Sequence, residues 1–476
     1  MIKHKQKKIS KTILFCSIAV SLCIFLLTPG AVFAEEYPVS APEALPGTTV
    51  EMNSPDFWIN RAEEPDKIIM SYSEIKTLNQ KNVSRVITTD HPYADNIQQI
   101  EKDGPVFIRM NPLETGENYP SKPVRDRLEE NITRLNKSTL YDQWELPYKE
   151  SKKAEIINAL NLENVPDILH PKKGILVRHT STRLYPTAEP GYRMRNYLDD
   201  NNVTSLDIGM PVAVMHLSRT GEYCYAMTPI AWGWIPLQDI AFETAVRIET
   251  FIDMEKIIVI TGHKVPCYTD KSYSVFHGNL YLGERLPIES KSSDGICVTI
   301  PDREFDGSLF FRQVWVRAGE SVHEGWLPYT KRNVITTAFR LLGRPYGWHD
   351  SWDERDCGGI MRVIFNCFGF TLPRYWSFQQ LYSDFATHVG DISDMDRKTA
   401  ILCSMPEGIT FTGSTGHIGL YLGNVDGKPY VIHQCGWNYK EGEKEYKMAK
   451  VVVSDYVNVG FDMKGLKFFT PLTDIK

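Results

Sequence analysis

The sequence of 476 residues predicts a mixed α+β protein, because three stretches of different pattern follow one another after residue 34. Residues 35–165 are polar and carry helical periodicity, interrupted by proline-rich breaks. Residues 166–330 consist of short β-rich runs separated by turn residues. From residue 331 onward two helical stretches are followed by β-rich runs, which is typical of one α+β domain over residues 331–476.

The N-terminal part carries its helical patterns at residues 66–80, 124–135 and 148–162. We expect a small, mainly helical domain over residues 35–165 with long loops. Its sequence shows no constellation of catalytic side chains, so we expect the catalytic residues in the later parts of the chain.

An internal echo marks the β-rich part. Residues 233–236 (GWIP) recur as residues 325–328 (GWLP). Each copy closes a segment of roughly 75–85 residues, a size suited to a small barrel. We therefore expect two related barrels, at residues 166–245 and 246–330. Two unrelated β-domains, each ending in a buried tryptophan, are the alternative.

Residues 1–34 have the pattern of a cleavable export signal. Five lysines precede an apolar stretch, residues 13–27, that is short for a membrane span. Val32 and Ala34 supply small residues at the usual −3 and −1 positions, so we place cleavage after Ala34. An uncleaved anchor is the alternative.

The remaining chain is acidic. Removal of the five lysines of the signal lowers the formal net charge from −6 to −11. Phosphates would repel such a protein, so we expect no nucleic-acid partner. No stretch after the signal is long and apolar enough to span a bilayer. We expect a secreted monomer of the cell envelope.

Nine cysteines occur in the chain, and seven remain after the signal. An odd number in an exported protein leaves at least one free thiol. Their spacing shows no disulfide framework. His433 and Cys435 form the one tight His/Cys pair, without a CxxC partner, so we expect no metal and no other cofactor.

Cys357 is the candidate nucleophile. It belongs to residues 356–359 (DCGG), immediately before an apolar run at 360–370 that predicts a helix. A cysteine in the first turn of a helix lies at the positive end of the macrodipole, near free backbone N–H groups. This position favours the thiolate, the nucleophilic form.

Two histidines occur on predicted strands downstream. His417 alternates with apolar residues in its strand, and His433 lies on the next strand of a hairpin. A two-residue turn would place His433 opposite Leu420, on the wrong face. A three-residue loop at 425–427 would place it opposite Gly419, on the face of His417. We predict the three-residue loop, or another odd-length loop; a plain two-residue turn without a bulge would remove His433 from the site.

A thiol, a base and a group that orients the base form the arrangement of a cysteine peptidase. Each residue has a simpler interpretation: a packed cysteine, or a histidine hydrogen-bonded within a sheet. The combination of a cysteine at a helix start with two histidines on neighbouring strands favours the catalytic interpretation.

The order and spacing of five motifs resemble the NlpC-type cell-wall cysteine peptidases. The motifs are residues 346–348 (YGW), 356–359 (DCGG), 372–374 (LPR), 416–423 (GHIGLYLG) and 431–433 (VIH). The resemblance implies a papain-like peptidase fold. The whole mature chain is similar to a subgroup with a helical N-terminal clip domain and two bacterial SH3-like barrels before the peptidase.

The resemblance also implies roles for residues of the site. Cys357 matches the nucleophile, His417 the base and His433 the third polar residue. Tyr346 matches the tyrosine that helps the Cys357 backbone N–H hold the oxyanion. A buried aromatic without catalytic function is the alternative for Tyr346.

The chain departs from the family at Gly358, where the usual residue is serine. In relatives that serine and the preceding acid, Asp356 here, line the pocket for the N-terminal end of the peptide. Arg374 and Ser377 match positions that line the groove, with a solvated loop as the alternative. Trp232 stands where relatives often carry a tyrosine near the active site, and we expect it to contact substrate.

The resemblance implies an exported peptidoglycan hydrolase that cleaves the bond between γ-D-glutamyl and a diamino acid in stem peptides. Its partners would be stem peptides or muropeptides. An inactive wall-binding protein is one alternative, and an amidase or acyltransferase on the same fold is another.

Overall fold

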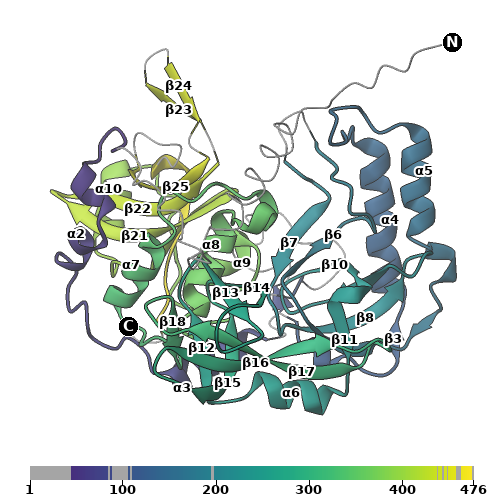
Figure 1. Ribbon diagram of the computed structural model, residues 1–476. Helices are drawn as coiled ribbons and strands as arrows, with labels where there is room; N and C mark the ends of the chain where they lie inside the picture. Colours follow the sequence, from purple (N-terminus) through teal and green to yellow (C-terminus); the bar gives the residue numbers. More distant parts are fainter. Residues whose placement is uncertain are drawn as a thin grey trace, which may run out of the picture. The chain divides into compact units, whose positions relative to one another are not determined.

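A computed structural model of the chain describes residues 44–83, 86–87, 106–107, 110–193, 198–436, 438–441, 444–447, 449–456 and 463–473 (Figure 1). The predicted export signal, residues 1–34, lies outside the described residues. Residues Ser40–Lys476 form one compact unit. Within the described ranges, no helix has the length and apolar character needed to cross a membrane.

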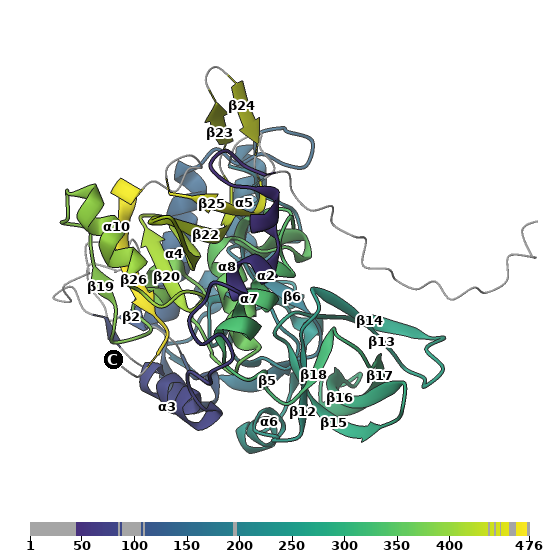
Figure 2. The ribbon, with the colours of Figure 1, turned by 90° about the vertical axis from the view of Figure 1, so that its left-hand side faces the viewer.

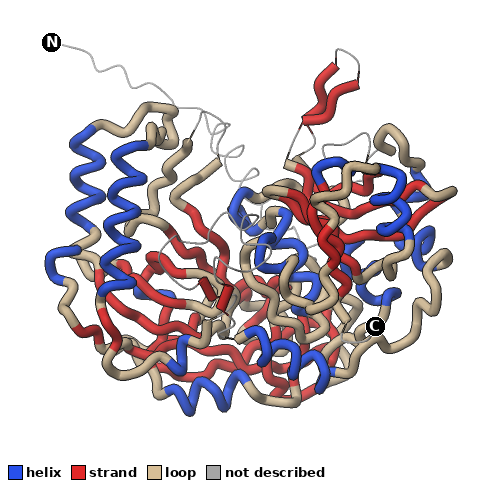
Figure 3. Tube along the Cα trace, turned by 180° about the vertical axis from the view of Figure 1, so that it is seen from behind, coloured by secondary structure: helices blue, strands red, loops and turns tan. Residues whose placement is uncertain are grey.

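The helices of the N-terminal part divide between two hydrophobic cores. Short helix α2 (Pro55–Ile59) packs beside α7 (Lys331–Phe339) of the C-terminal part (Figure 2). Helix α3 (Tyr72–Asn82) buries Ile75 and Leu78 in the same core. Helices α4 (Lys122–Lys137) and α5 (Glu150–Ala159) lie side by side (Figure 3), and α4 packs on the first of the two large sheets. The boundaries expected for a clip domain remain a prediction.

Two seven-stranded antiparallel sheets follow, with one strand order. The first is β11-β5-β8-β9-β10-β6-β7 and the second β18-β12-β15-β16-β17-β13-β14, so each strand has its counterpart seven strands later. The first sheet comprises β5 (Lys172–Leu176), β6 (Thr180–Arg183), β7 (Asn202–Leu206), β8 (Pro211–Leu217), β9 (Tyr223–Met227), β10 (Trp232–Pro236) and β11 (Ile240–Phe242). The second comprises β12 (Ile257–Ile260), β13 (Lys264–Tyr268), β14 (Phe276–Tyr281), β15 (Arg285–Lys291), β16 (Gly295–Arg303), β17 (Leu309–Arg317) and β18 (Val322–Glu324).

The repeated motif GW[IL]P, which predicted this repeat, does not occupy equivalent positions in the two sheets. Residues 233–236 lie on β10, where Trp234 is buried. Residues 325–328 follow β18, and Trp326 is half-buried against Tyr72. The counterpart of β10 is β17, which carries Trp315. The repeat is therefore evident in the strand order, whereas the two copies of the motif occupy different positions in it.

The C-terminal part combines a six-stranded antiparallel sheet with helices. The strand order is β19-β26-β20-β21-β22-β25. Helix α8 (Cys357–Asn366) packs against β21 (His417–Val425) and β22 (Lys428–Cys435). The other elements are η6 (Trp348–Asp353), α9 (Trp376–Gln379), α10 (Met395–Cys403), β19 (Thr387–His388), β20 (Thr410–Ser414), β25 (Lys450–Asp455) and β26 (Leu466–Pro471).

The hairpin between β21 and β22 has a two-residue turn, so the predicted three-residue loop is wrong. Asp426 and Gly427 both have positive φ, 52° and 77°, as a type I′ turn requires. A bulge between Tyr421 and Gly423 then shifts the register by one residue. Beyond the bulge the pairing is the one that an odd-length loop would have given, and His433 returns to the face of His417.

Candidate active site

Cys357 is the first residue of α8, and Asp356 caps the helix by accepting a hydrogen bond of 2.9 Å from the Gly359 N–H. The thiol is 7% exposed. Helix α8 packs against β21, and the backbone N–H of Ile418, the residue after His417, lies close enough to the sulfur to lower the pKa of the thiol. The start of α8 and the start of β21 therefore meet at the thiol.

The environment of Cys357 differs from the sequence expectation in one respect. Burial raises the pKa of the thiol to about 12, and the neighbouring Asp356 carboxylate acts in the same direction. The Ile418 N–H acts in the opposite direction but is outweighed. The thiol is thus neutral at rest, because loss of water outweighs the helix terminus that favoured a thiolate.

The two histidines are in direct contact. His417 Nε2 lies 2.8 Å from His433 Nδ1, and His433 Nε2 lies 2.9 Å from Oγ of Ser454 on β25. All three side chains are buried. If each Nε2 carries the ring proton, each histidine donates to the next group in the chain, and His417 Nδ1 is the nitrogen that can accept a proton.

Burial also keeps both imidazoles uncharged. It lowers the pKa of His433 to about 3 and holds the pKa of His417 well below its usual value, with His433 adding to the effect on His417. The resting site is a neutral thiol beside a neutral base, so proton transfer would accompany nucleophilic attack.

Tyr346 is half-buried close to the thiol. Burial raises its pKa, and the nearby Cys357 and Asp356 raise it further, so the phenol keeps its proton. Its ring packs on the backbone at Gly436, where an added Cβ would lie 3.0 Å from ring atoms. A protonated phenol can donate to an oxyanion, and this role of Tyr346 stays a prediction.

Asp356 is fully engaged by Arg374. The guanidinium donates from Nη1 to Oδ1 at 3.0 Å and from Nη2 to Oδ2 at 2.6 Å, and both side chains are buried. Although burial opposes it, Arg374 holds the pKa of Asp356 below its usual value. Arg374 is therefore no solvated loop residue, and the carboxylate already has its cationic partner.

Steric crowding explains why residue 358 is glycine. A Cβ at this position would lie 2.9 Å from the backbone oxygen of Arg374 and 3.3 Å from its Nη1. The serine usual in the family would not fit without movement of backbone. Ser377 is buried on α9, whose Gln379 donates 2.9 Å hydrogen bonds to the carbonyls of Gly358 and Pro373.

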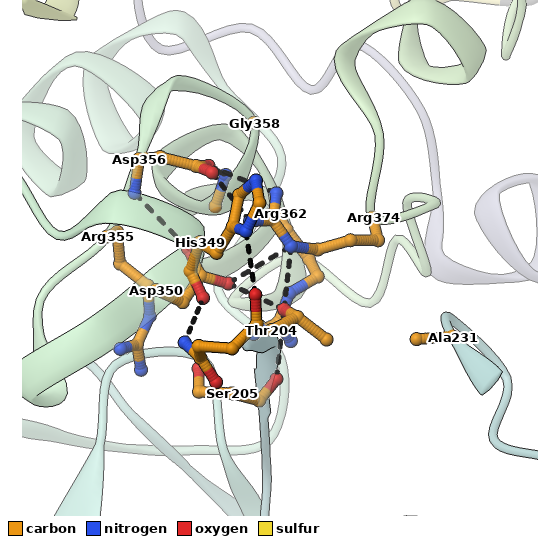
Figure 4. Close-up of polar contacts among 12 residues, drawn as sticks. Thr204, Ser205, Ala231, His349, Asp350, Arg355, Asp356, Gly358, Arg362 and Arg374 are labelled. Atoms are coloured by element: carbon orange, nitrogen blue, oxygen red, sulfur yellow. Dashed lines mark hydrogen bonds and ion pairs between the residues drawn. The ribbon is translucent and has the colours of Figure 1, made fainter. Parts of the chain in front are cut away.

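The first sheet contributes polar residues to this network, which the sequence did not predict. Thr204 Oγ1 on β7 accepts from Arg374 Nε at 2.6 Å and donates to Asp350 Oδ2 at 2.9 Å (Figure 4). Asp350 Oδ1 accepts from the Asp356 N–H at 3.2 Å. Asn202 Nδ2 donates to the carbonyl of His349 at 2.8 Å.

The segment held by these contacts is strained. His349, Asp350, Trp352 and Asp353 all have φ between 52° and 62°, the left-handed region that non-glycine residues rarely adopt. No spacing in the sequence identifies Thr204 or Ser454 as members of the site, because Thr204 contacts Asp350, 146 residues away, and Ser454 contacts His433, 21 residues away.

Trp232 is not brought to Cys357 by any contact among the described residues. The Arg127 guanidinium of α4 lies 5.1 Å from the centre of the Trp232 ring, and the centre of the Tyr119 ring lies 6.3 Å from it. The indole N–H donates to Met110 Sδ. Ala231, the preceding residue, stands apart from the Arg374 network in Figure 4. Trp232 thus packs against the N-terminal part.

Comparison with known proteins supports the architecture. Residues 197–236 match the family model of the SH3 domain of SH3b1 type. A solved NlpC/P60 endopeptidase from Photobacterium damselae subsp. piscicida is 18% identical, covering 87% of this chain and 96% of its own, with a TM-score of 0.67. An NlpC/P60 family protein from Bacillus cereus is 17% identical over 63% of this chain and 98% of its own, with a TM-score of 0.43. No curated protein matches. The chain thus has the fold of an NlpC/P60 endopeptidase with an SH3 domain.

Proposed function

We propose that this chain is a cysteine endopeptidase of the bacterial cell wall, cleaving the γ-D-glutamyl–diamino acid bond of stem peptides. The observation that carries the proposal is the packing of α8, which starts at Cys357, against β21, which starts at His417, together with the buried chain from His417 through His433 to Ser454. The likeness to the Photobacterium endopeptidase supports the same reaction class.

The proposed reaction starts from the neutral pair. His417 Nδ1 takes the thiol proton as Cys357 Sγ attacks the carbonyl of the γ-D-glutamyl residue. The Cys357 N–H and the Tyr346 hydroxyl donate to the oxyanion. His417 then protonates the leaving amine of the diamino acid, and water releases the acyl group. His433, fixed by Ser454, keeps the His417 ring in the productive tautomer.

The remaining parts of the chain fit this reaction. We propose a papain-like peptidase domain at residues 331–476, SH3-like barrels at 166–245 and 246–330, and a clip domain at 35–165. Export through the signal at 1–34 would deliver the enzyme to its substrate. An SH3 domain of the bacterial type suggests attachment to the wall.

Asp356 is already paired within the protein, which bears on how the peptide is recognised. Because Arg374 occupies both oxygens of Asp356, this acid is not proposed as the partner of a ligand amine. Gly358 offers no hydroxyl. We propose that Arg374, Asp356 and Gly358 form the wall of the pocket, with Ser377 behind it, and that the free amine contributes little to binding.

Mass spectrometry of a digest of defined stem peptides and muropeptides tests the proposal. The wild type should release a product with a newly freed diamino-acid amine, and Cys357→Ala should release none while keeping its circular dichroism spectrum. Release at the sugar end would support an amidase instead. Full activity of Cys357→Ala would overturn the mechanism.

A further inference from the structure

A second cluster of ionisable side chains lies where the two sheets meet α8. His179 follows β5, Asp207 follows β7, and Glu284 precedes β15. Each offers one ligand atom, and the three atoms lie within 4.8 Å of one another. Two different sheets therefore contribute to one group, and the reaction proposed above uses none of its members.

In each carboxylate a hydrogen bond from the protein fixes one oxygen, and the other oxygen belongs to the group of three ligand atoms. Arg362 Nη1 on α8 donates to Asp207 Oδ2 at 2.5 Å, while Asp207 Oδ1 is buried without a hydrogen-bond partner. The Tyr281 N–H donates to Glu284 Oε2 at 2.9 Å, and Glu284 Oε1 lies 3.5 Å from His179 Nδ1. That nitrogen is also buried without a hydrogen bond. Such outer contacts orient metal ligands in known sites.

The charge of the group favours a cation. Two carboxylates meet at this buried position: Asp207 forms an ion pair with Arg362, whereas Glu284 has no ion pair with a lysine or arginine among the described residues. Glu284 is 2% and Asp207 9% exposed. Glu284 Oε1 accepts a long hydrogen bond of 3.4 Å from the Ile208 N–H. Burial of this kind is costly unless a proton or a metal ion joins the group.

The donor set fits a transition metal. One imidazole nitrogen and two carboxylate oxygens match the ligands of Zn²⁺, at about 2.0–2.2 Å each. Tetrahedral ligands at that distance stand about 3.4 Å apart. His179 Nδ1 and Glu284 Oε1, 3.5 Å apart, already have this separation. The other ligand atoms lie within 4.8 Å of one another, so they would move together by at most about 1.4 Å when the ion binds. Asp207 and Glu284 also line a cavity of about 160 Å³, which offers an entry path and room for a water ligand.

We propose that His179, Asp207 and Glu284 bind one divalent transition-metal ion, Zn²⁺ by its ligand chemistry. The ion would join the first sheet to the second beside α8. Arg362 lies five residues beyond Cys357, about 7.5 Å along the helix, so the ion would stabilise the assembly at a distance from the thiol.

Metal content of the purified chain, with any affinity tag removed, tests this site. After dialysis against Zn²⁺ and then against metal-free buffer, elemental analysis should find about one Zn²⁺ per chain. Zn²⁺ should raise the melting temperature, and a chelator should reverse the rise. Co²⁺ should give visible absorption bands of a low-coordinate N/O site.

Variants locate the ion. Glu284→Gln and His179→Gln should each weaken Zn²⁺ binding by at least about 10-fold. His263→Gln is the matched control, because His263 is also buried and lies 3.7 Å from the carboxylate of Glu354, outside the cluster. Absence of bound Zn²⁺ and Co²⁺ in the wild type would overturn the proposal, as would unchanged affinity in a folded Glu284→Gln chain. Both readouts are independent of hydrolysis.

Discussion

The two sheets share one strand order but meet the C-terminal part in different ways. The first sheet reaches it with polar side chains, Asn202 and Thr204, which hold the strained segment before Cys357. The second sheet contributes mainly apolar residues to the hydrophobic core behind α8, among them Val259 on β12 and Leu282 in the turn after β14. Its polar contact with the strained segment is a partly exposed ion pair between Lys264 and Asp353. The same strand order therefore serves two functions. The first sheet positions the polar residues beside Cys357, and the second sheet supplies part of the hydrophobic core that supports α8.

This difference separates two kinds of effect. Loss of apolar contact from the second sheet should lower stability and leave the geometry of folded molecules intact. Loss of a polar contact from the first sheet should disturb Arg374 and Asp356, and thereby the residue next to the nucleophile. Substitutions in the two sheets can test whether stability and activity separate in this way.

The largest effect is expected from Leu282→Ala, in the turn that joins β14 to β15 of the second sheet. Leu282 is 2% exposed within the shared core, and its truncation should cost about 3 kcal/mol of the free energy of unfolding. Chemical denaturation measures that loss. The kcat/KM of the folded fraction should stay within about twofold of wild type; a large fall in kcat/KM without loss of stability would contradict the assignment.

Thr204→Val tests the first sheet. The substitution removes the hydroxyl shared by Arg374 and Asp350, which leaves buried charged groups short of a partner, and kcat/KM should fall about 10-fold. Ser205→Ala is the control, since the Ser205 hydroxyl on the same strand is buried without a hydrogen-bond partner. Equal activity of Thr204→Val and Ser205→Ala would show that the first sheet does not tune the site.

A smaller effect concerns pH. Burial lowers the pKa of His433 to about 3 in the folded chain, whereas an unfolded histidine titrates near 6.5. As the pH falls, His433 is therefore protonated in the unfolded chain before it is protonated in the folded chain. The contribution of the neutral His433 to the free energy of unfolding is fully present above a pH of about 6.5 and is lost as the pH falls toward 3. His433→Asn should flatten the dependence of unfolding free energy on pH in that window. An unchanged slope would mean that His433 is accessible to protons when folded.

Local patterns predicted much of this molecule. The helix beginning at Cys357 follows from a capping acid and an apolar run, and the strands of His417 and His433 follow from alternation. The face of His433 was also predicted, although for a wrong reason. A turn of Asp426 and Gly427 was combined with a bulge at Leu422, and no residue there marks a bulge in advance.

Contacts between distant segments could not be predicted in the same way. Asp356 was expected to be open to a ligand, yet Arg374, 18 residues later, pairs with it in the folded chain. The thiolate expected at Cys357 assumed an exposed helix start, and burial reverses the outcome. Probing the thiol at mildly acidic pH therefore does not separate a catalytic from a structural cysteine here.

The most direct test of the account is the mass of the intact protein during turnover. The wild type, quenched in acid while it hydrolyses a defined stem peptide, should carry the acyl half of the substrate on the peptide that contains Cys357. His417→Gln should carry little of it, because the thiol keeps its proton. An unmodified protein during active hydrolysis, or an acyl group on another residue, would contradict the account.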